Sequence, residues 1–309
     1  MAIPIPCRRR WRLLSLFLFC AGIAPAIAGD PAEFTYRTNT AEVRLSFSAT
    51  DQNNHGVATL QPNDFAVVDK DIIVRNFQSF TRSDWTKLEI AILLDASESV
   101  TPRFRQETAD VLNLVSQTAG IPDENLFMLS FHGLQPALLC AGNCRASRVA
   151  EQLPAGRAGG LTPLFDTIVF ASDFLSQRGG DAHAERVLII FSDGADTISR
   201  NSLRDAIDAA LRNEVQLDCI DLNQRSYSSE GAAVLRSLAS ATGGRYFPPP
   251  DGAVRALNVI LEDFRTSYTV SYRLPSRASG FHTVRILPTH NLHLQFRSRS
   301  GYYYPNRVR

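Results

Sequence analysis

The chain has 309 residues, of which 44% are hydrophobic and 20% are charged, and its formal net charge is +1. This composition is typical of a folded globular protein with one large domain or two modest ones, and it excludes a low-complexity or disordered chain. Because basic and acidic side chains nearly balance, the chain lacks the basic excess of nucleic-acid-binding proteins, and we expect no nucleic-acid partner.

The first 28 residues differ from the rest of the chain and predict a secretory signal peptide. A cluster of arginines precedes an apolar run from Leu13 to Ile23, and Ala26 and Ala28 stand in the small-residue positions of a cleavage site. The apolar run is short for a membrane span, which needs about 20 residues, and no later segment qualifies. We therefore expect an exported protein, periplasmic or secreted, without stable membrane insertion. Residues 1–28 hold four arginines and no acids, so the formal net charge of the remaining chain is about −3.

Residues 34–80 show the alternation of apolar and polar side chains that is typical of half-buried strands. The pattern is clearest in the segments EVRLSFSATD and IIVRNFQSF, and turn-forming residues lie between them in DQNNHG. This part of the chain therefore predicts antiparallel β-structure.

From residue 88 onward, strand-like segments alternate with helix-like ones. The strand-like segments are the apolar runs LEIAILLD, NLFMLSFHG, RVLIIFSD and VQLDCIDL, together with PALLC as a short edge strand. Runs of this kind are typical of parallel strands that are buried on both faces. The first helix-like segment carries residues at helical spacing, namely Phe104, Thr108, Val111, Leu112 and Val115. The alternation predicts a doubly wound α/β domain, with a mostly parallel sheet covered by helices on both faces.

The C-terminal segment returns to the alternating pattern of the N-terminal one. Residues 268–299 contain the strand-like segments YTVSYRL, HTVRIL and LHLQFRS. Neither flank has enough strands for a stable core of its own. We therefore expect residues 29–87 and 268–309 to form one small antiparallel β-domain, with an α/β domain over residues 88–267 inserted between them.

Residues whose side-chain oxygens can bind a metal ion stand at three places where a predicted strand ends or a helix begins. The first group is Asp95, Ser97 and Ser99, the second is Thr162 in GGLTPLFDT, and the third is Asp193 in IIFSDGAD. Ser and Asp in such places often only cap helices. However, ligands of open α/β sheets bind at the carboxyl ends of the strands. Carboxylates and hydroxyls without His or Cys suit Mg²⁺ or Mn²⁺, so the sequence predicts a site for one of these ions.

The segments DASES, LTPLFDT and FSDGAD resemble the metal-ion-dependent adhesion site of the von Willebrand factor type A (VWFA) domain. That domain is a doubly wound fold with D-x-S-x-S, a threonine and an aspartate in this order, and the resemblance covers about residues 86–267. The flanks, with VATLQPNDFAVVDKDIIVRNFQSF before this region and SYTVSYRLPSRASGFHTVRI after it, resemble exported bacterial VWFA-related proteins abundant in acidobacteria. The resemblance implies hydroxyl ligands from Ser97, Ser99 and Thr162, and binding by Asp95 and Asp193 directly or through water. It also implies that an Asp or Glu carboxylate of a partner protein completes the coordination.

Two residues near the predicted site are candidates for contact with the ion's hydration water or with its ligand. Glu98 stands where many members of the acidobacterial subgroup have glycine. We expect its extra carboxylate either to repel an acidic ligand or to accept hydrogen bonds from the ion's hydration water, and so to affect the choice of partner more than metal binding. His132 ends the strand NLFMLSFHG on the same edge of the predicted sheet.

Cys140 and Cys144, in the segment CAGNC, predict a disulfide because an exported protein meets oxidising conditions. The alternative is half a zinc site, for which no His pair has matching spacing. Cys219, in the apolar-rich VQLDCIDL, is expected to be a buried free thiol.

These observations favour a protein-interaction module of the cell-adhesion kind and no enzyme. One alternative is a structural VWFA domain with a vestigial metal site. A second is a Mg²⁺-dependent phosphatase of the haloacid dehalogenase type, which needs an acid at position 97, where Ser97 stands, and a lysine after Lys87, where the sequence has none. A serine hydrolase lacks its G-x-S-x-G motif.

Overall fold

The computed structural model describes most of the chain after the predicted signal peptide, and residues 40–309 form one compact unit. Residues 1–28 lie outside the described residues. Within the described part of the chain, no helix combines the length and the apolar character that crossing a membrane requires. The described residues are 41–83, 88–117, 123–152, 160–178, 184–223, 229–249 and 253–305.

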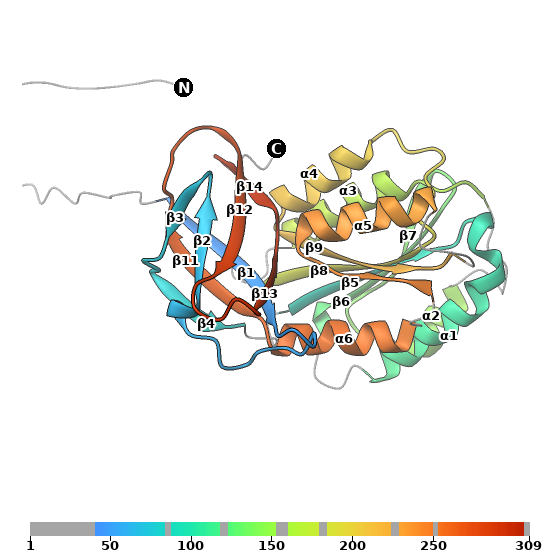
Figure 1. Ribbon diagram of the computed structural model, residues 1–309. Helices are drawn as coiled ribbons and strands as arrows, with labels where there is room; N and C mark the ends of the chain where they lie inside the picture. The colour runs from blue at the N-terminus through green and yellow to red at the C-terminus, as the bar shows by residue number, and fades with distance from the viewer. Residues whose placement is uncertain are drawn as a thin grey trace, which may run out of the picture. The chain divides into compact units, whose positions relative to one another are not determined.

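A six-stranded sheet lies at the centre of the α/β region (Figure 1). Its strands are β5 (Leu88–Asp95), β6 (Leu126–His132), β7 (Gln135–Ala141), β8 (Glu185–Ser192), β9 (Val215–Asp221) and β10 (Tyr246–Phe247). Their order is β10-β9-β8-β5-β6-β7, and all neighbours are parallel except β6 and β7. Every residue of β5 is buried, as expected for a central parallel strand. The predicted mostly parallel sheet is confirmed.

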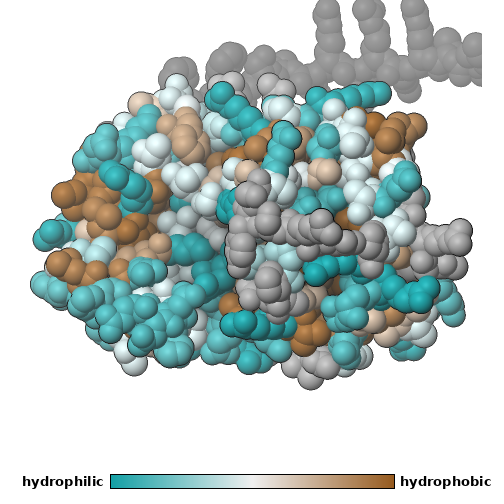
Figure 2. All heavy atoms as spheres, turned by 45° about the vertical axis from the view of Figure 1, so that its right-hand side comes forward, coloured by the Kyte–Doolittle hydropathy of each residue, from teal (hydrophilic) through white to brown (hydrophobic). Residues whose placement is uncertain are grey.

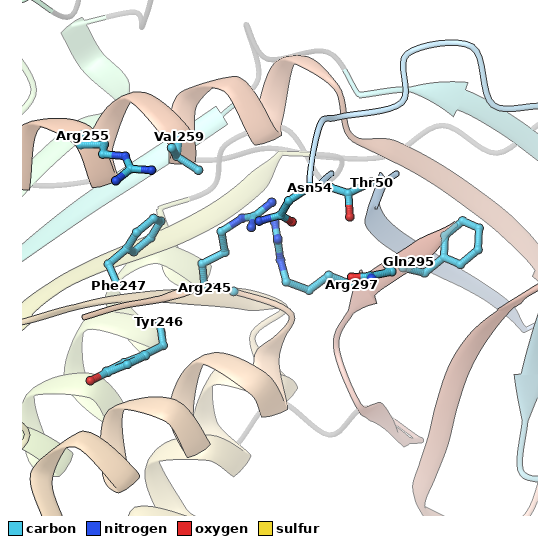
Figure 3. Close-up of a pocket in the computed structure, with 11 residues that line it drawn as sticks. Thr50, Asn54, Arg245, Tyr246, Phe247, Arg255, Val259, Gln295 and Arg297 are labelled. Carbon is cyan, nitrogen blue, oxygen red and sulfur yellow. The ribbon is translucent and has the colours of Figure 1, made fainter. Parts of the chain in front are cut away.

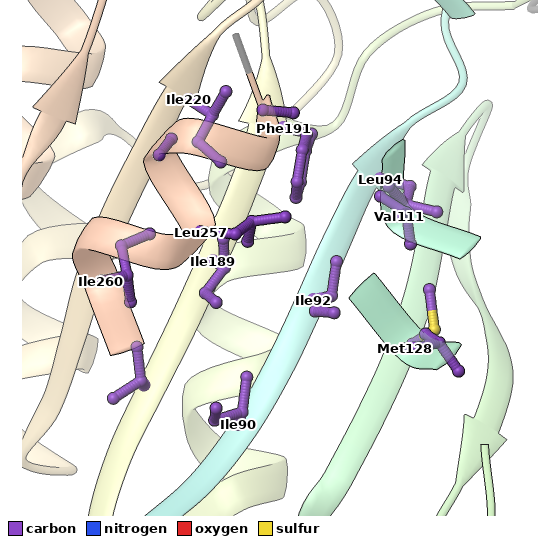
Figure 4. Packing of buried hydrophobic residues seen from close by; sticks show 14 of the residues in the cluster. Ile90, Ile92, Leu94, Val111, Met128, Ile189, Phe191, Ile220, Leu257 and Ile260 are labelled. Carbon is purple, nitrogen blue, oxygen red and sulfur yellow. The ribbon is translucent and has the colours of Figure 1, made fainter. Parts of the chain in front are cut away.

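Helices cover both faces of this sheet, as Figure 1 shows. The helices are α1 (Thr101–Gln117), α2 (Ala146–Gln152), α3 (Leu164–Gln177), α4 (Leu203–Arg212), α5 (Glu230–Thr242) and α6 (Ala253–Arg265). On one face, α1, α2 and α6 share a buried cluster with alternate residues of β5, and on the other face α3, α4 and α5 do so with the intervening residues. Figure 4 shows the first cluster, where Ile92 and Leu94 of β5 lie between Val111 of α1 and Leu257 of α6.

The order of the strands creates a switch point between β5 and β8. From β5 the chain runs outward to β6 and β7, and it then returns to β8 on the opposite side of β5. The segments that follow β5 and β8 therefore leave neighbouring strands in opposite directions. In doubly wound folds, ligands bind in the crevice outside the carboxyl ends of the strands at this point. Asp95 ends β5, and Asp193 directly follows β8.

The two flanks of the chain pair with each other in two antiparallel four-stranded sheets. Strand β1 lies between β11 and β13, and β2 pairs with β12, so both sheets combine N-terminal and C-terminal strands. The strand orders are β13-β1-β11-β4 and β14-β12-β2-β3. The strands are β1 (Glu42–Thr50), β2 (Phe65–Asp69), β3 (Ile72–Val74), β4 (Ser79–Arg82), β11 (Tyr268–Arg273), β12 (Gly280–Pro288), β13 (Gln295–Ser298) and β14 (Gly301–Tyr304). The expected antiparallel pairing of the flanks is confirmed.

The two antiparallel sheets share one aromatic-rich core. Phe47 of β1 lies against Phe65 of β2 with ring centroids 5.0 Å apart, and Tyr268 of β11 belongs to the same cluster. Contacts also join these sheets to the α/β region: Arg297 Nη2 lies 2.7 Å from Asp263 Oδ2 of α6. Because such contacts hold residues 40–309 in one unit, the division at residues 88 and 267 stays a prediction.

The surface mixes hydrophilic and hydrophobic side chains. In the view of Figure 2, hydrophobic side chains form several separate areas between hydrophilic ones. The most exposed large apolar side chains belong to different elements, namely Leu134 (89%), Leu292 (76%) and Ile73 (62%). Single exposed apolar residues of this kind are common on folded proteins, so exposure alone marks no site here.

Candidate metal site

Asp95 is the last residue of β5 and is fully buried, and both of its carboxylate oxygens accept hydrogen bonds. Oδ1 accepts a hydrogen bond from the Ser97 backbone N–H at 2.9 Å, and Oδ2 accepts one from Ser192 Oγ at 2.6 Å. Burial raises the pKa of Asp95 to about 6, and the negative charge of Asp193 contributes, while the hydrogen bonds from Ser192 and Ser97 oppose the rise. A cation beside Asp95 would offset this unfavourable burial of charge.

The loop after Asp95 presents two hydroxyls beside each other. Ser97 Oγ and Ser99 Oγ lie 3.1 Å apart; Ser97 is buried, whereas Ser99 is exposed in the short 3-10 turn Glu98–Val100. Two backbone hydrogen bonds hold this loop: the Ala96 N–H donates to Phe131 O at 3.0 Å, and the Glu98 N–H donates to Gly160 O at 3.2 Å. The second bond joins the loop to the segment that carries Thr162.

Asp193 follows β8 in a loop whose shape depends on two glycines. Its Oδ1 accepts a hydrogen bond from the Ala195 N–H at 3.0 Å, and the side chain is half-buried. Gly194 has a φ of 78°, and a Cβ atom there would lie 2.2 Å from Gly231 O; a Cβ at Gly231 would lie 2.0 Å from Asp193 O. Only glycine fits such close backbone contact, so this pair sets the position of Asp193 against the first turn of α5.

Thr162 is held against the loop that carries Asp193. The Thr162 N–H donates to Thr197 Oγ1 at 2.7 Å, and Thr162 O accepts from the Thr197 N–H at 2.8 Å. A further hydrogen bond joins the same two segments, since Asp196 Oδ1 accepts from the Phe165 N–H at 3.2 Å. These bonds bring the segment before α3 and the loop after β8 together, so the segments that carry the predicted ligands lie at one edge of the sheet.

The oxygen atoms at this edge fit a hard divalent cation. Asp95 and Asp193 supply negative charge, and the hydroxyls of Ser97, Ser99 and Thr162 supply neutral oxygens, the donor set that Mg²⁺ and Mn²⁺ prefer. Among the described residues, no group of three or more His, Cys, Asp and Glu side chains stands in metal-binding geometry. An ion at this edge would therefore need the hydroxyls and water to complete its coordination.

The two candidate contact residues lie on the rim of this site. Glu98 and His132 are both exposed, and a Cβ atom at Gly160 would lie 3.8 Å from His132 Nδ1. The Gly133 N–H donates to Leu161 O at 2.7 Å, which joins the turn after β6 to the segment before Thr162. Leu161 is 55% exposed on this rim. The roles of Glu98 and His132 stay predictions.

The cysteines of CAGNC lie away from the five predicted ligands. In the structure Cys140 and Cys144 are joined by a disulfide, with their Cα atoms 5.5 Å apart, at the junction of β7 and α2. Cys219 is a free, buried thiol in β9.

Two residues that hold the predicted ligands in place were not identified from the sequence. Ser192 donates a hydrogen bond to Asp95, and Thr197 accepts one from the Thr162 N–H, but each partner lies far away along the chain. The sequence also did not identify Glu107 as a residue of the buried stripe of α1, whereas the predicted stripe members Thr108 and Leu112 are only half-buried. The sequence signal for Glu107 was its spacing, three residues after Phe104 and four before Val111, which places an acidic residue on the apolar face of the helix.

A cavity of about 420 Å³ lies elsewhere, beside α6, β10 and β13 (Figure 3). Arg245 and Arg297 converge there, next to Asn54. Both guanidinium groups are paired with Asp263, with Arg245 Nη2 2.9 Å from Oδ1 and Arg297 Nη2 2.7 Å from Oδ2. None of the predicted metal ligands lines this cavity, and Arg245 and Arg297 link the segment before β10 and strand β13 to α6 through Asp263.

Neither a family model nor a curated protein matches the sequence. Several solved structures are similar in fold. An aerotolerance-related membrane protein from Bacteroides fragilis is 18% identical, with 57% of this chain and 98% of that chain covered and a TM-score of 0.44. Manganese-loaded TRAP from Plasmodium vivax is 16% identical, with 86% and 100% covered and a TM-score of 0.45. Proximal thread matrix protein 1 of the mussel byssus, with a zinc-occupied MIDAS motif, is 15% identical, with 60% and 49% covered and a TM-score of 0.45.

At these identities and TM-scores, the likenesses describe similarity only. This chain spans about half the length of the mussel protein. The fold is established by this chain's own strand order and by the order of its motifs, D-x-S-x-S after β5, Thr162 before α3 and Asp193 after β8. Membership of the acidobacterial subgroup stays a prediction. Residues 88–265 therefore have a doubly wound α/β fold, and the order of their strands and motifs resembles that of the von Willebrand factor type A domain.

Proposed function

We propose that the chain is a protein-interaction module in an exported protein, and that it binds a carboxylate of a partner through a divalent ion. The ion, Mg²⁺ or Mn²⁺, is held at the switch point between β5 and β8 by Asp95, Ser97, Ser99, Thr162 and Asp193. The observation that carries this proposal is that Asp95 is buried and that both of its carboxylate oxygens accept hydrogen bonds, with no basic side chain beside it among the described residues.

The chemistry of such a site favours an external carboxylate as the last ligand. Two aspartates offset the double charge of the ion, and the three hydroxyls add none, so the ion stays electrophilic. An Asp or Glu of a partner that displaces water gains a strong attraction in these partly desolvated surroundings. The exposed side chains of His132 and Leu161 on the rim offer further contact to the same partner.

Catalysis is not part of this proposal. Ser97 Oγ contacts Ser99 Oγ, and neither group is a base that could activate the other as a nucleophile. A phosphatase of the kind considered above needs an acid where Ser97 stands. The remaining alternative is a structural domain whose metal site is vestigial.

Affinity capture from the exported fraction tests the proposed function. The purified protein is immobilised and exposed to that fraction with millimolar Mg²⁺ or with EDTA. We expect partners that are retained with Mg²⁺, released by EDTA and lost with Asp193→Asn. Asp71→Asn is the matched control, because its side chain is 95% exposed and lies in the β2–β3 turn. A partner that binds equally well in EDTA would exclude a metal bridge and leave the vestigial alternative.

A further inference from the structure

Glu107 is a buried carboxylate in α1, eight residues after Ser99. Its side chain is 2% exposed, and neither carboxylate oxygen has a hydrogen-bond partner among the described residues. It lies on the stripe of α1 that faces the sheet, between the buried residues Phe104 and Val111. Figure 4 shows Val111, the next residue of this stripe, beside Leu94 and Met128. Glu107 therefore occupies a position where an apolar side chain would ordinarily pack.

The charged groups that act on Glu107 belong mainly to the metal site. Burial is the main cause that raises the pKa of Glu107 well above its ordinary value, and the next two causes are the negative charges of Asp95 and Asp193. Asp110, on the same helix, adds a weaker effect of the same sign. The geometry agrees, because α1 begins directly after the loop that carries Ser97 and Ser99, and Glu107 stands in its second turn on the stripe that packs against β5.

A buried carboxylate without a partner is unfavourable, and such groups are retained where a cation or water compensates them. Among the described residues, no three or more His, Cys, Asp and Glu side chains are grouped so that they could hold a metal ion, so Glu107 does not form such a group with Asp95 and Asp193. Glu107 is therefore too remote to be a direct ligand, and its effect on an ion must pass through water or through the electric field.

We propose that Glu107 is a positioning residue of the metal site. An ion at Asp95 and Asp193 offsets their negative charge and so favours the ionised form of Glu107, which then accepts a hydrogen bond from a water molecule of the ion's hydration shell. This inference rests on the proposed function, because it requires an ion at Asp95 and Asp193. Residues beyond the direct ligands commonly change metal affinity by about 10–100-fold, which sets the expected size of the effect.

Titration calorimetry with MnCl₂ alone tests the proposal on four proteins: the wild type, Glu107→Gln, Glu107→Met and Asp110→Asn. We expect Glu107→Gln and Glu107→Met to raise the Kd for Mn²⁺ about 10–100-fold. Asp110→Asn is the matched control, since it removes one negative charge from the same helix at a more exposed position whose carboxylate already accepts from Gln106 Nε2. Solvent screening should keep the Kd of this control within about threefold of the wild type.

The metal-free melting temperature separates a positioning role from a packing role. Glu107→Met replaces an unpartnered carboxylate with an apolar side chain of similar size, so its melting temperature in EDTA should equal or exceed that of the wild type. If Glu107→Gln does not fold, the Kd of Glu107→Met for Mn²⁺ tests the proposal by itself. Wild-type affinity for Mn²⁺ in the Glu107 variants would overturn this inference while leaving the metal site intact. A wild type that binds no Mn²⁺ would overturn the proposed function, and the inference with it.

Discussion

Replacing Asp95 with Asn should stabilise the metal-free protein and abolish its response to metal. The pKa of Asp95 is about 6 in the folded protein against an ordinary 3.8, and the side chain is fully buried. At about 1.36 kcal/mol per pKa unit, keeping Asp95 ionised at pH 7 costs the fold about 3 kcal/mol. Because the folded pKa is raised, this cost is absent below about pH 4, grows as the pH rises and is fully present above about pH 6.

The substitution also weakens one of two hydrogen bonds. Asn has one acceptor oxygen, so either the Ser192 hydroxyl or the Ser97 N–H loses its partner, at a cost of about 1 kcal/mol. The net expectation for metal-free Asp95→Asn at pH 7 is a gain of about 2 kcal/mol in the free energy of unfolding. Metal at about 100 times its Kd should stabilise the wild type by about 2.7 kcal/mol and leave the variant unchanged.

Urea and thermal unfolding at pH 7, in EDTA and in millimolar Mg²⁺ or Mn²⁺, measure both effects. For the wild type, the metal should raise the melting temperature by about 5–10 °C. Asp71→Asn, which is exposed, should respond as the wild type does. The reasoning is refuted if Asp95→Asn keeps the metal-dependent rise, or if it is markedly less stable than the wild type in EDTA.

Three further predictions follow from the same geometry. Gly231→Ala places a Cβ atom 2.0 Å from Asp193 O, so it should lower the free energy of unfolding by about 2 kcal/mol. It should also reduce the metal-dependent rise in melting temperature, and an unchanged rise would mean that this contact does not set the position of Asp193. The metal-dependent rise should shrink as the pH falls through about 6, because protons then compete with the ion for Asp95, and an equal rise at pH 5 and pH 7 would contradict this. Mass spectrometry of the natively exported protein should show Cys140 joined to Cys144 and Cys219 free, and free thiols at Cys140 and Cys144 would contradict the pairing. Reduction of this disulfide should lower the free energy of unfolding by less than the roughly 3 kcal/mol expected for a 15-residue loop.

The central sheet could be predicted because its strands are buried on both faces. β5 and β8 are continuous apolar runs, and their carboxyl ends are marked by the change to Asp95 and Asp193. Strand β2 lies within residues 34–80, which were predicted as β-structure, but its own bounds gave no clear signal. Its residues, Phe65–Asp69, are all buried, so they lack the alternation that identified the other flank strands. Short buried runs outside a βα pattern give no periodic signal.

The candidate ligands could be predicted because each lies in a local motif at a strand end or a helix start. The groups that hold them could not be predicted, since Ser192 reaches Asp95 and Thr197 reaches Thr162 only after the sheet and its loops have assembled. Glu107 is the clearest example of a residue whose surroundings could not be predicted from the sequence. Its spacing places it on the buried stripe of α1, but only the fold brings that stripe close to Asp95 and Asp193.

Anomalous diffraction from crystals equilibrated with millimolar Mn²⁺ would test the proposed metal site most directly. An anomalous difference peak should lie between the side-chain oxygens of the five predicted ligands, outside the carboxyl ends of β5 and β8, and it should disappear in Asp95→Asn crystals. Well-ordered wild-type crystals without a peak at this edge of the sheet would contradict a metal-dependent site. The five ligands are Asp95, Ser97, Ser99, Thr162 and Asp193.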